Sequence, residues 1–359
     1  MNFKALYPVL QSYTYLNTAY SGILSKPLLD WRNNHDQDFL KRGSTFRLQQ
    51  QEVMQETRQN LARLFRAKAS NTFLVPNFSF GFNTFLNGLE GPQRFLLLQE
   101  DYPSVNYPVQ SRGYECDYVA VDHQLEENLI ANIKSFKPSV LALSLVQYIS
   151  GIKIDFESIK KIKSMFPDLL IVADGTQFCG TAEFNFEASG LDVLISSGYK
   201  WMLGGFGNGF VFIKDKINEL LYTKAQSANM PTEPFLLNRG ILSLYFEPGH
   251  QDTLSFGSLN HSILFLEKTG LSFIENQISQ LSKKARKAFT ERGLLDLAVT
   301  QRKSHSSIFN LSISATVAEK LQEANILFSA RGNGSRVSFH FYNTEEDLNH
   351  LLEVIDKNS

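Results

Sequence analysis

The chain contains little cysteine. Its only two cysteines, Cys116 and Cys179, lie far apart and outside any CxxC pattern. This argues against a disulfide framework and a cysteine-based zinc site, and it suits a reducing compartment. No run of about 18 apolar residues occurs, and the first residues, MNFKALYPVLQSYTYLN, contain no uninterrupted apolar segment of the signal-peptide kind. The sequence therefore predicts a cytoplasmic protein without a membrane span.

The sequence also lacks an excess of charge, because 35 basic residues face 36 acidic ones and the formal net charge is −1. No overall field then attracts the chain to nucleic acid or to an anionic membrane. The patterns GxxxxGK[ST], HExxH and GxSxG are absent as well, which weakens the ATPase, metalloprotease and serine hydrolase alternatives. The seven histidines form no ligand cluster, so no metal site is expected.

What the chain does contain is an alternation of short apolar runs and amphipathic stretches over residues 70–213. Intervening segments such as 126–136 and 156–166 have apolar residues at roughly helical spacing. This alternation predicts an α/β fold with a mostly parallel sheet covered by helices. The apolar runs that would form the strands are 72–76, 94–98, 140–146, 169–174, 192–197 and 209–213.

The two ends of the chain differ in character from this middle part. Residues 46–67 contain no Pro or Gly and many good helix formers, which predicts a long helix before the sheet. A long helical region over 258–292 and a strand, helix, strand and helix pattern follow the sheet. We expect a large α/β domain and a smaller α+β domain, formed by residues 20–245 and by residues 1–19 plus 246–359.

Polar side chains follow three of the apolar runs, at the carboxyl ends of strands where open parallel sheets bind ligands. Asp174 ends one run, Ser197 and Lys200 follow another, and Ser79 follows a third. A buried carboxylate needs a cation or several donors, and the protonated ring nitrogen of pyridoxal 5′-phosphate (PLP) is such a cation. A desolvated lysine can bind the aldehyde of PLP as a Schiff base and later carry a proton.

Each of these residues also has a simpler interpretation. Asp174 precedes Gly175 and could cap a turn, as Asp before Gly commonly does. Lys200 could contact a phosphate or a carboxylate from a Gly-rich loop. The two residues together favour the PLP hypothesis over either single explanation. The glycines of GGFGNG (204–209) do not fit GxGxxG and lead into a strand, so they do not predict a dinucleotide site.

The strings VADGTQFCG and LDVLISSGYKWMLGGFGNGF resemble the core signature of the class V aminotransferase family of fold-type I PLP enzymes. This family includes cysteine desulfurases, kynureninase and isopenicillin-N epimerase-like proteins. The shared features are Asp174, then Gln177, and a Ser-Gly-aromatic-Lys run that ends at Lys200. The resemblance implies a mainly parallel seven-stranded sheet. It extends over nearly the whole chain through residues 15–22, 77–83, 102–108, 144–151, 246–250 and 336–352.

The resemblance implies roles for the residues around PLP. Lys200 would form the Schiff base, Asp174 would pair with the ring nitrogen, and Gln177 would hydrogen-bond the phenolic oxygen. Tyr102 would stack on the ring. A helix N-terminus and the lysine loop would hold the phosphate through Ser79, Phe80, Ser197 and Tyr199. His250 matches the residue that the partner subunit brings to the phosphate, which implies a homodimer with active sites at its interface.

The resemblance also implies a site for a small amino-acid substrate. Arg336 matches the family arginine that binds the substrate α-carboxylate through two parallel hydrogen bonds. Without the resemblance, Arg336 could equally be a surface residue on an edge strand. Asn17 and Tyr20 would line the same entrance. Tyr148 stands where cysteine desulfurases have an asparagine near the carboxylate, which alters the substrate pocket.

A cysteine desulfurase of this family needs a thiol on a mobile loop before the carboxylate-binding arginine, and residues 320–335 contain no Cys. Cys179 is interpreted as a buried core thiol. We therefore expect an aminotransferase that moves an amino group between a small amino acid and a 2-oxo acid. The alternatives are a β- or γ-lyase, a desulfurase-like cysteine or selenocysteine lyase, an amino-acid epimerase, and a PLP-binding or amino-sugar-binding protein that has lost turnover.

Overall fold

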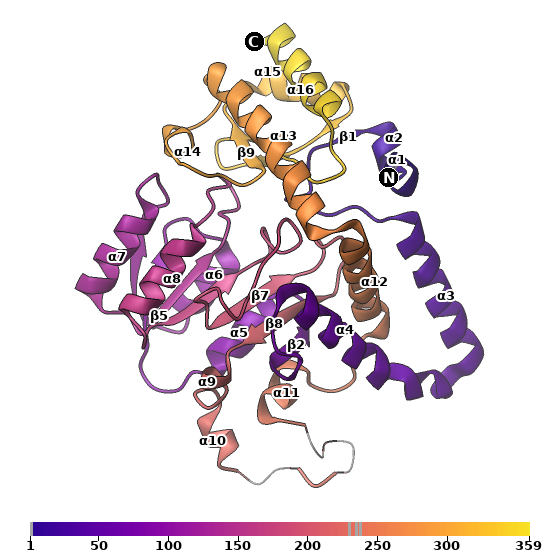
Figure 1. Cartoon of the computed structure of the whole chain (residues 1–359), viewed down its shortest axis with the longest axis vertical. Coiled ribbons are helices and arrows are strands. Elements are labelled where there is room, and N and C mark those ends of the chain that lie inside the picture. The colour runs from indigo at the N-terminus through magenta and orange to yellow at the C-terminus, as the bar shows by residue number, and fades with distance from the viewer. Residues whose placement is uncertain (1–2, 229–230, 234–235, 237–238) are drawn as a thin grey trace.

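The computed structural model describes residues 3–228, 231–233, 236 and 239–359 (Figure 1). Its central sheet consists of β2 (Thr72–Val75), β3 (Arg94–Leu98), β4 (Glu115–Val119), β5 (Val140–Ser144), β6 (Leu170–Asp174), β7 (Val193–Ser197) and β8 (Gly209–Ile213). The strand order is β2-β8-β7-β6-β5-β3-β4. The five strands from β7 to β4 are parallel, whereas β8 is antiparallel to both of its neighbours. The expected α/β fold with a mainly parallel seven-stranded sheet is confirmed.

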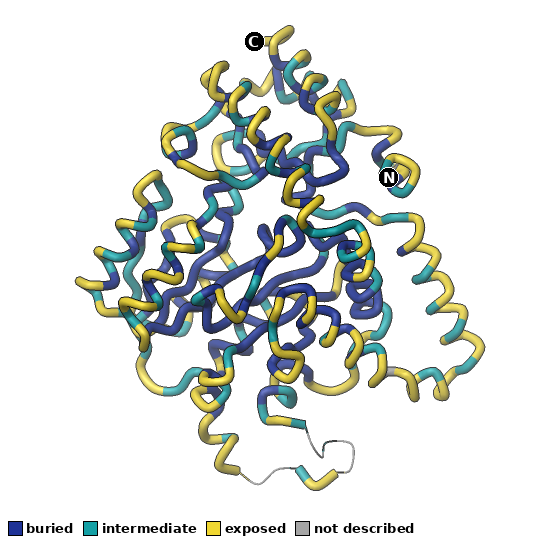
Figure 2. The backbone as a smooth tube through the Cα atoms, in the orientation of Figure 1, coloured by how far each residue is buried: buried dark blue, intermediate teal, exposed yellow. Residues whose placement is uncertain are grey.

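Helices cover both faces of this sheet. One face packs against α4 (Gln50–Phe65), α7 (Leu125–Phe136), α8 (Phe156–Met165) and α12 (Thr253–Thr269). The opposite face packs against α5 (Phe78–Gly88), α6 (Pro103–Gln110) and α11 (Ile241–Phe246). Successive strand residues point to opposite faces, so in β6 Ile171 belongs to the first core and Val172 to the second. Figure 2 shows the resulting buried centre.

The two long helical regions are divided differently from the sequence prediction. The predicted helix at 46–67 begins as a 3₁₀ segment, η1 (Gly43–Gln49), and continues as α4; α3 (Lys26–Arg42) precedes both. The predicted region at 258–292 is two helices, α12 and α13 (Leu271–Glu291). They are separated at Gly270, whose φ of 91° cannot continue an α-helix.

The C-terminal part forms a separate three-stranded antiparallel sheet in the order β11-β12-β9. The C-terminal part as a whole contains β9 (Ile308–Leu311), α15 (Ala315–Glu323), β10 (Ile326–Leu327), β11 (Ser329–Arg331), β12 (Gly334–Ser338) and α16 (Glu345–Asn358). The N-terminal β1 (Thr14–Tyr15) pairs in parallel with β10, while α12 packs on α4 beside the large sheet. The division at residues 20–245 remains a proposal. The remaining short elements are α1 (Phe3–Leu6), α2 (Val9–Ser12), η2 (Ala69–Asn71), α9 (Asp215–Asn218), α10 (Thr223–Gln226) and α14 (Leu297–Thr300).

The helix α13 crosses from the large sheet to the C-terminal part (Figure 1). Its buried residues include Ile274, Ile278 and Leu281, and charged residues occupy its exposed side. This amphipathic pattern is typical of a helix on the surface of a core. Among the residues that the structure describes, no helix has the length and apolar character needed to cross a membrane.

Candidate active site

A cavity of about 350 Å³ lies at the carboxyl ends of β5, β6 and β7. Eight residues predicted for the site line it: Ser79, Tyr102, Tyr148, Asp174, Gln177, Ser197, Tyr199 and Lys200. A second cavity of about 210 Å³ shares Tyr102, Tyr148, Tyr199 and Lys200 with the first and adds Tyr20 and Arg336. The structure thus brings ten of the predicted residues to two adjoining cavities.

Asp174 is the last residue of β6, and only 7% of its surface is exposed. Its Oδ1 accepts a hydrogen bond of 2.8 Å from the amide of Thr176. Burial raises the pKa of Asp174 to about 6, although Thr176 and Lys200 act in the opposite direction. The protonated ring nitrogen of PLP would provide the close cation that stabilises the ionised form of Asp174.

Lys200 lies in the loop between β7 and β8, also with 7% of its surface exposed. Its Nζ is 5.7 Å from the ring centroid of Tyr102 and 5.5 Å from that of Tyr199. Burial lowers the pKa of Lys200 to about 7, and the charge of Arg336 adds to this effect, while Asp174 opposes it. A large share of neutral amine at neutral pH is what an attack on an aldehyde requires.

The lysine loop is fixed by segments from both ends of the chain. The amide of Gly22 donates to the carbonyl of Tyr199 at 2.9 Å, and His340 Nε2 lies 3.0 Å from the carbonyl oxygen of Trp201. A Cβ on Gly22 would lie 2.3 Å from the carbonyl oxygen of Lys200. Glycine is therefore required at position 22 for the N-terminal segment to approach the lysine backbone.

Gln177 is held in one orientation by two hydrogen bonds. Its Oε1 accepts from Trp201 Nε1 at 2.8 Å, and its Nε2 donates to the carbonyl of Ala19 at 2.9 Å. A side-chain amide nitrogen carries two hydrogens, so Nε2 keeps a second donor for a ligand. This donor fits the predicted contact with the phenolic oxygen of PLP.

The predicted phosphate end of the cavity lies at the N-terminus of α5. Ser79 Oγ donates to Ser104 Oγ at 2.8 Å, and Ser197 Oγ accepts from the amide of Phe78 at 2.9 Å. The amide of Phe80, however, donates to Asn77 Oδ1 at 2.9 Å, and Phe80 does not line the cavity. The hydroxyls of Ser79 and Ser197 at a helix N-terminus suit an anion, whereas the Phe80 amide is already engaged.

Arg336 is on β12, the middle strand of its sheet, with only 2% of its surface exposed. It is thus not a surface residue on an edge strand. Its Nη1 donates to the carbonyl of Tyr148 at 2.5 Å, and its Nε is buried without a hydrogen-bond partner in the part of the chain that the structure describes. Burial lowers the pKa of Arg336 to about 10, and Arg331 adds to the shift. An unsatisfied buried guanidinium donor at a cavity fits a carboxylate ligand.

Arg331 was not predicted from the sequence, yet it lines the second cavity beside Arg336. Its guanidinium lies 5.3 Å from the ring centroid of Tyr20, and its Nη1 donates to the carbonyl of Ala330. In the β11–β12 hairpin Ser329 pairs with Arg336, which makes Arg331 and Arg336 diagonal neighbours on one face. The Gly-Asn pair between the two strands is a hairpin signal that could have predicted this arrangement.

Asp101 is a second residue that the sequence analysis missed. It is buried, and its two oxygens accept from the amides of Tyr102 at 2.7 Å and Ser144 at 2.8 Å. Burial raises the pKa of Asp101. Asp101 thus ties Tyr102 to the carboxyl end of β5. The sequence gives little indication of this role, because an Asp before Tyr-Pro is typical of the start of a helix.

Three predicted residues, Phe80, Asn17 and His250, do not line these cavities. Asn17 instead binds β11, since its Oδ1 accepts from Ser329 Oγ at 2.7 Å. His250 lies in a different groove of about 1010 Å³, together with Arg58 and Glu247. The role of His250 toward a partner subunit therefore stays a prediction.

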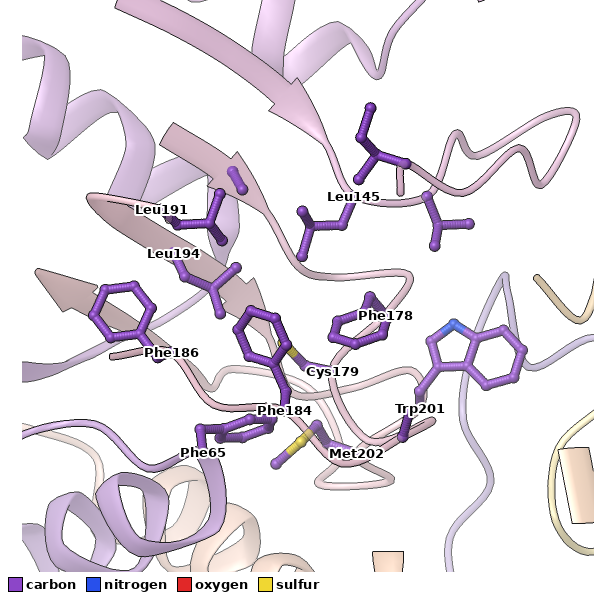
Figure 3. Close-up of a cluster of buried hydrophobic side chains, with 14 of the residues drawn as sticks. Phe65, Leu145, Phe178, Cys179, Phe184, Phe186, Leu191, Leu194, Trp201 and Met202 are labelled. Carbon is purple, nitrogen blue, oxygen red and sulfur yellow. The ribbon is translucent and has the colours of Figure 1, made fainter. Parts of the chain in front are cut away.

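The two cysteines do not contribute a thiol to either cavity. Cys179 lies among Phe178, Phe184 and Met202 (Figure 3), with 2% of its surface exposed. Burial raises the pKa of Cys179 to about 12, which keeps it in the unreactive thiol form. Cys116 is on β4, at the edge of the sheet. Within the described ranges, no group of His, Cys, Asp or Glu could hold a metal ion.

The side chains of the two cavities match the functional groups of PLP and an amino acid. Asp174 suits the ring nitrogen, Lys200 the aldehyde and Arg336 a carboxylate. A sequence model of the class V aminotransferases matches residues 32–351, and the chain belongs to this family. Enzymes of this family use PLP, so the family and the cofactor expected from the sequence are confirmed.

Individual relatives have related but different descriptions. An uncharacterized aminotransferase, YcbU of Bacillus subtilis, is 22% identical over 362 residues, which cover 98% of this chain and 96% of the relative. Several other relatives are described as probable cysteine desulfurases.

Solved structures of similar fold include a cysteine desulfurase and a cystine C–S lyase. An apo cysteine desulfurase from Thermococcus onnurineus covers 99% of this chain and 96% of its own, with a TM-score of 0.84 and 18% identity. The cystine C–S lyase C-DES, in complex with cysteine persulfide, covers 98% of this chain and 99% of its own, with a TM-score of 0.84 and 20% identity. Another C-DES structure carries glycine covalently linked to PLP. At these identities the comparison shows the shared fold.

Proposed function

We propose that this protein is a PLP-dependent lyase that cleaves a Cβ–sulfur or Cβ–selenium bond in a small amino acid. The descriptions of the relatives and of the similar structures support this alternative better than the aminotransferase that we expected first. The composition of the site supports direct elimination in particular, because no enzyme thiol lines the cavities at Lys200. A desulfurase that stores sulfur on its own cysteine would need such a thiol.

The proposed reaction is an elimination followed by hydrolysis. The Cα–H and Cβ–S bonds of the amino acid break, and the sulfur leaves with the electron pair of its bond. Uptake of one water then gives a 2-oxo acid and ammonium, so that L-cysteine would yield sulfide and pyruvate. When bound, PLP supplies an electron sink for the electron pair at Cα.

Different residues of the two cavities would contribute to different steps of this reaction. Lys200 Nζ would hold PLP, then take the Cα proton and return a proton to the leaving sulfur. Asp174 would keep the ring nitrogen protonated, and Gln177 would fix the ring. Arg336 would bind the α-carboxylate, and Arg331 would bind a second anionic group of the substrate or share the first.

Amino-group transfer to a 2-oxo acid is the second candidate. It is favoured by the description of the B. subtilis relative as an aminotransferase and by the same lack of a thiol at the site. Transfer and elimination both require Lys200 to move the Cα proton. They differ in what happens next, because elimination needs a leaving group on Cβ and transfer needs a second amino acceptor.

The decisive experiment incubates the PLP-loaded protein with L-cysteine, L-cystine or L-selenocysteine in the absence of any 2-oxo acid. We expect pyruvate together with sulfide, persulfide or selenide, and no product from the Lys200→Ala variant. Absence of pyruvate with all three substrates would reject the lyase. Formation of a new amino acid only after a 2-oxo acid is added would establish the transferase, and loss of optical activity would indicate an epimerase.

The attachment of PLP is tested separately. Borohydride reduction of the loaded protein followed by peptide mapping should place the label on Lys200. A label on another lysine, or no chromophore after reconstitution, would contradict the assignment of the site. This result does not depend on which reaction the enzyme catalyses.

A further inference from the structure

A third cavity, of about 240 Å³, lies between the large sheet and the C-terminal part. Its walls come from α13, from the segment 303–309, and from residues 177–182 after β6. Val146 and Gln177 line both this cavity and the PLP cavity. A ligand in the third cavity would therefore lie next to the residues that fix the cofactor ring.

Basic side chains dominate this third cavity. Lys153, Lys283, Arg286 and Lys303 line it, whereas Glu275 is the one carboxylate among its lining residues. Lys153 is half-buried, and its ammonium makes no hydrogen bond or salt bridge within the described chain. The ammonium lies 5.8 Å from the ring centroid of Phe156 and interacts electrostatically with Glu275 and Asp155. Burial disfavours the ammonium form of Lys153, and Glu275 and Asp155 oppose this effect without forming an ion pair with it, so a directly bound anion would stabilise the ammonium.

Serine hydroxyls accompany these cations. Only 8% of the surface of Ser282 is exposed, and its Oγ has no hydrogen-bond partner among the described residues. Ser306 Oγ is engaged, because it donates to the carbonyl of Gly151 at 2.7 Å. Buried hydroxyls normally have a partner, and an unpartnered one on a cationic cavity wall is a donor for a ligand oxygen. The five serines of the cavity are Ser279, Ser282, Ser304, Ser306 and Ser307.

From this arrangement we infer that the third cavity binds a phosphate dianion, either inorganic phosphate or the phosphate group of a small ester. Lysine ammonium groups act as point charges toward phosphate, and its oxygens accept hydrogen bonds from hydroxyls. The volume accommodates a phosphate group with a short organic part. The bound dianion would join α13 of the C-terminal part to Lys153 of the large part.

The test is isothermal titration calorimetry of the PLP-loaded protein in phosphate-free buffer of constant ionic strength. The probes are inorganic phosphate, glycerol 3-phosphate and, as a non-phosphate dianion, sulfate. The visible spectrum is recorded during titration, so that displacement of PLP from its own phosphate site is detected. Tighter binding of the ester than of inorganic phosphate would identify a small phosphate ester as the ligand class, and the reverse order would identify free phosphate.

Amino-acid substitutions distinguish phosphate binding in the third cavity from unspecific attraction of phosphate to a basic surface. We expect Lys153→Gln and Lys283→Gln each to weaken phosphate binding about tenfold, the effect of losing one charge-assisted contact. Lys287→Gln should leave binding unchanged, because Lys287 is on the same helix but does not line the cavity. Lys283 and Lys303 are exposed, so their variants should fold even if Lys153→Gln does not.

Two results would overturn the inference. The first is no saturable heat with either phosphate probe. The second is an equal loss of affinity in Lys283→Gln, Lys303→Gln and Lys287→Gln, which would indicate unspecific attraction. Because binding is measured directly, failure of this test would leave the proposed lyase reaction unaffected.

Discussion

Lys200 and Asp174 lie in the same buried location, which shifts the pKa values of the two residues in opposite directions. Burial favours the neutral form of each, which lowers the pKa of the lysine and raises that of the aspartate. Their mutual attraction acts against both shifts. The guanidinium groups of Arg336 and Arg331 lower the pKa of Lys200 further, because a like charge nearby disfavours the ammonium form.

The first prediction concerns the pH dependence of PLP attachment to Lys200. Only the neutral amine attacks an aldehyde, and a lowered pKa means that the neutral form prevails above about pH 7. The attachment rate of the apo protein should therefore rise through pH 7 and level off well below pH 10, near which an unperturbed lysine of pKa about 10.4 titrates. Stopped-flow absorbance measures this rate, and Lys200→Ala is the blank. A rate that still rises steeply between pH 9 and 10 would contradict the prediction.

The second prediction concerns carboxylate binding by Arg336. Replacing Arg336 by Lys removes the planar fork but keeps a positive charge, so the loss reports geometry rather than charge. We expect KM for the amino acid to rise about 10- to 100-fold, equivalent to one charge-assisted hydrogen bond. Arg292→Lys is the control, because Arg292 pairs with Asp356 at the surface. Similar KM values for both variants would show that Arg336 does not bind the substrate carboxylate.

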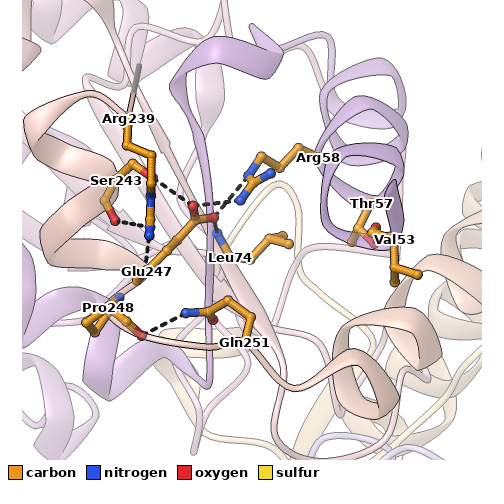
Figure 4. A network of polar contacts seen from close by, with 9 residues as sticks. All are labelled: Val53, Thr57, Arg58, Leu74, Arg239, Ser243, Glu247, Pro248 and Gln251. Atoms are coloured by element: carbon orange, nitrogen blue, oxygen red, sulfur yellow. Dashed lines mark hydrogen bonds and ion pairs between the residues drawn. The ribbon is translucent and has the colours of Figure 1, made fainter. Parts of the chain in front are cut away.

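Arg58 and Glu247 connect α4, β2 and α11 at the β2 edge of the large sheet (Figure 4). Arg58 of α4 donates to both oxygens of Glu247, at 3.0 and 2.7 Å, and the amide of Leu74 in β2 donates to Oε1 at 2.7 Å. Ser243 of α11 donates to Oε2 at 3.1 Å. Glu247 is 1% exposed, so its charge depends on these partners.

The third prediction follows from this network. Glu247→Gln should lower the free energy of unfolding by about 3 kcal/mol, because it leaves the Arg58 charge unpaired beside a buried site. Glu267→Gln breaks a similar two-pronged pair with Arg63 that is more exposed, at 25% for the Glu267 side chain against 2% for that of Glu247, and it should cost less than about 1 kcal/mol. Urea unfolding followed by circular dichroism compares the two. Equal losses would show that the burial of Glu247 is unimportant.

Strands buried on both faces could be predicted from the sequence, whereas two edge strands with few or no buried residues could not. The strands β5 to β8 are buried throughout and therefore carry continuous apolar runs. The edge strand β4 has the sequence ECDYV with only Val119 buried, and β11 has no buried residue. Both were missed because an open edge imposes little apolar pattern.

The site residues also divide into those that a local sequence pattern predicts and those that depend on contacts between segments. Asp174, Ser197 and Lys200 could be predicted because each lies at the end of an apolar strand or shortly after it. Arg331 requires the register of a hairpin. Asp101 requires knowledge that the segment after β3 contacts the end of β5 at Ser144, a contact between distant segments that no local pattern encodes.

At the scale of the whole molecule, α3 and η1 expose several apolar residues, although the ring of Phe39 contacts that of Phe46. Figure 2 shows α3 mostly as exposed and intermediate, and Leu28 is its one buried residue. Phe39, Leu40 and Leu48 are 55%, 76% and 81% exposed. Leu48 also lines the groove that contains His250. Exposed apolar side chains gathered in this way are typical of a protein interface, which supports the proposal of a homodimer with His250 near its partner.

The last prediction tests this interface. The double variant Leu40→Asp and Leu48→Asp places two carboxylates where a second copy would pack, and burial of unpaired charges is strongly unfavourable. We expect size-exclusion chromatography with light scattering to give a dimer for the wild type and a monomer for this variant. Leu297→Asp is the matched control, because Leu297 is 72% exposed but lies on α14, in the C-terminal part. A wild-type monomer, or a dimer that survives the double substitution, would place the interface elsewhere and would remove the structural reason for assigning His250 to the site of a partner.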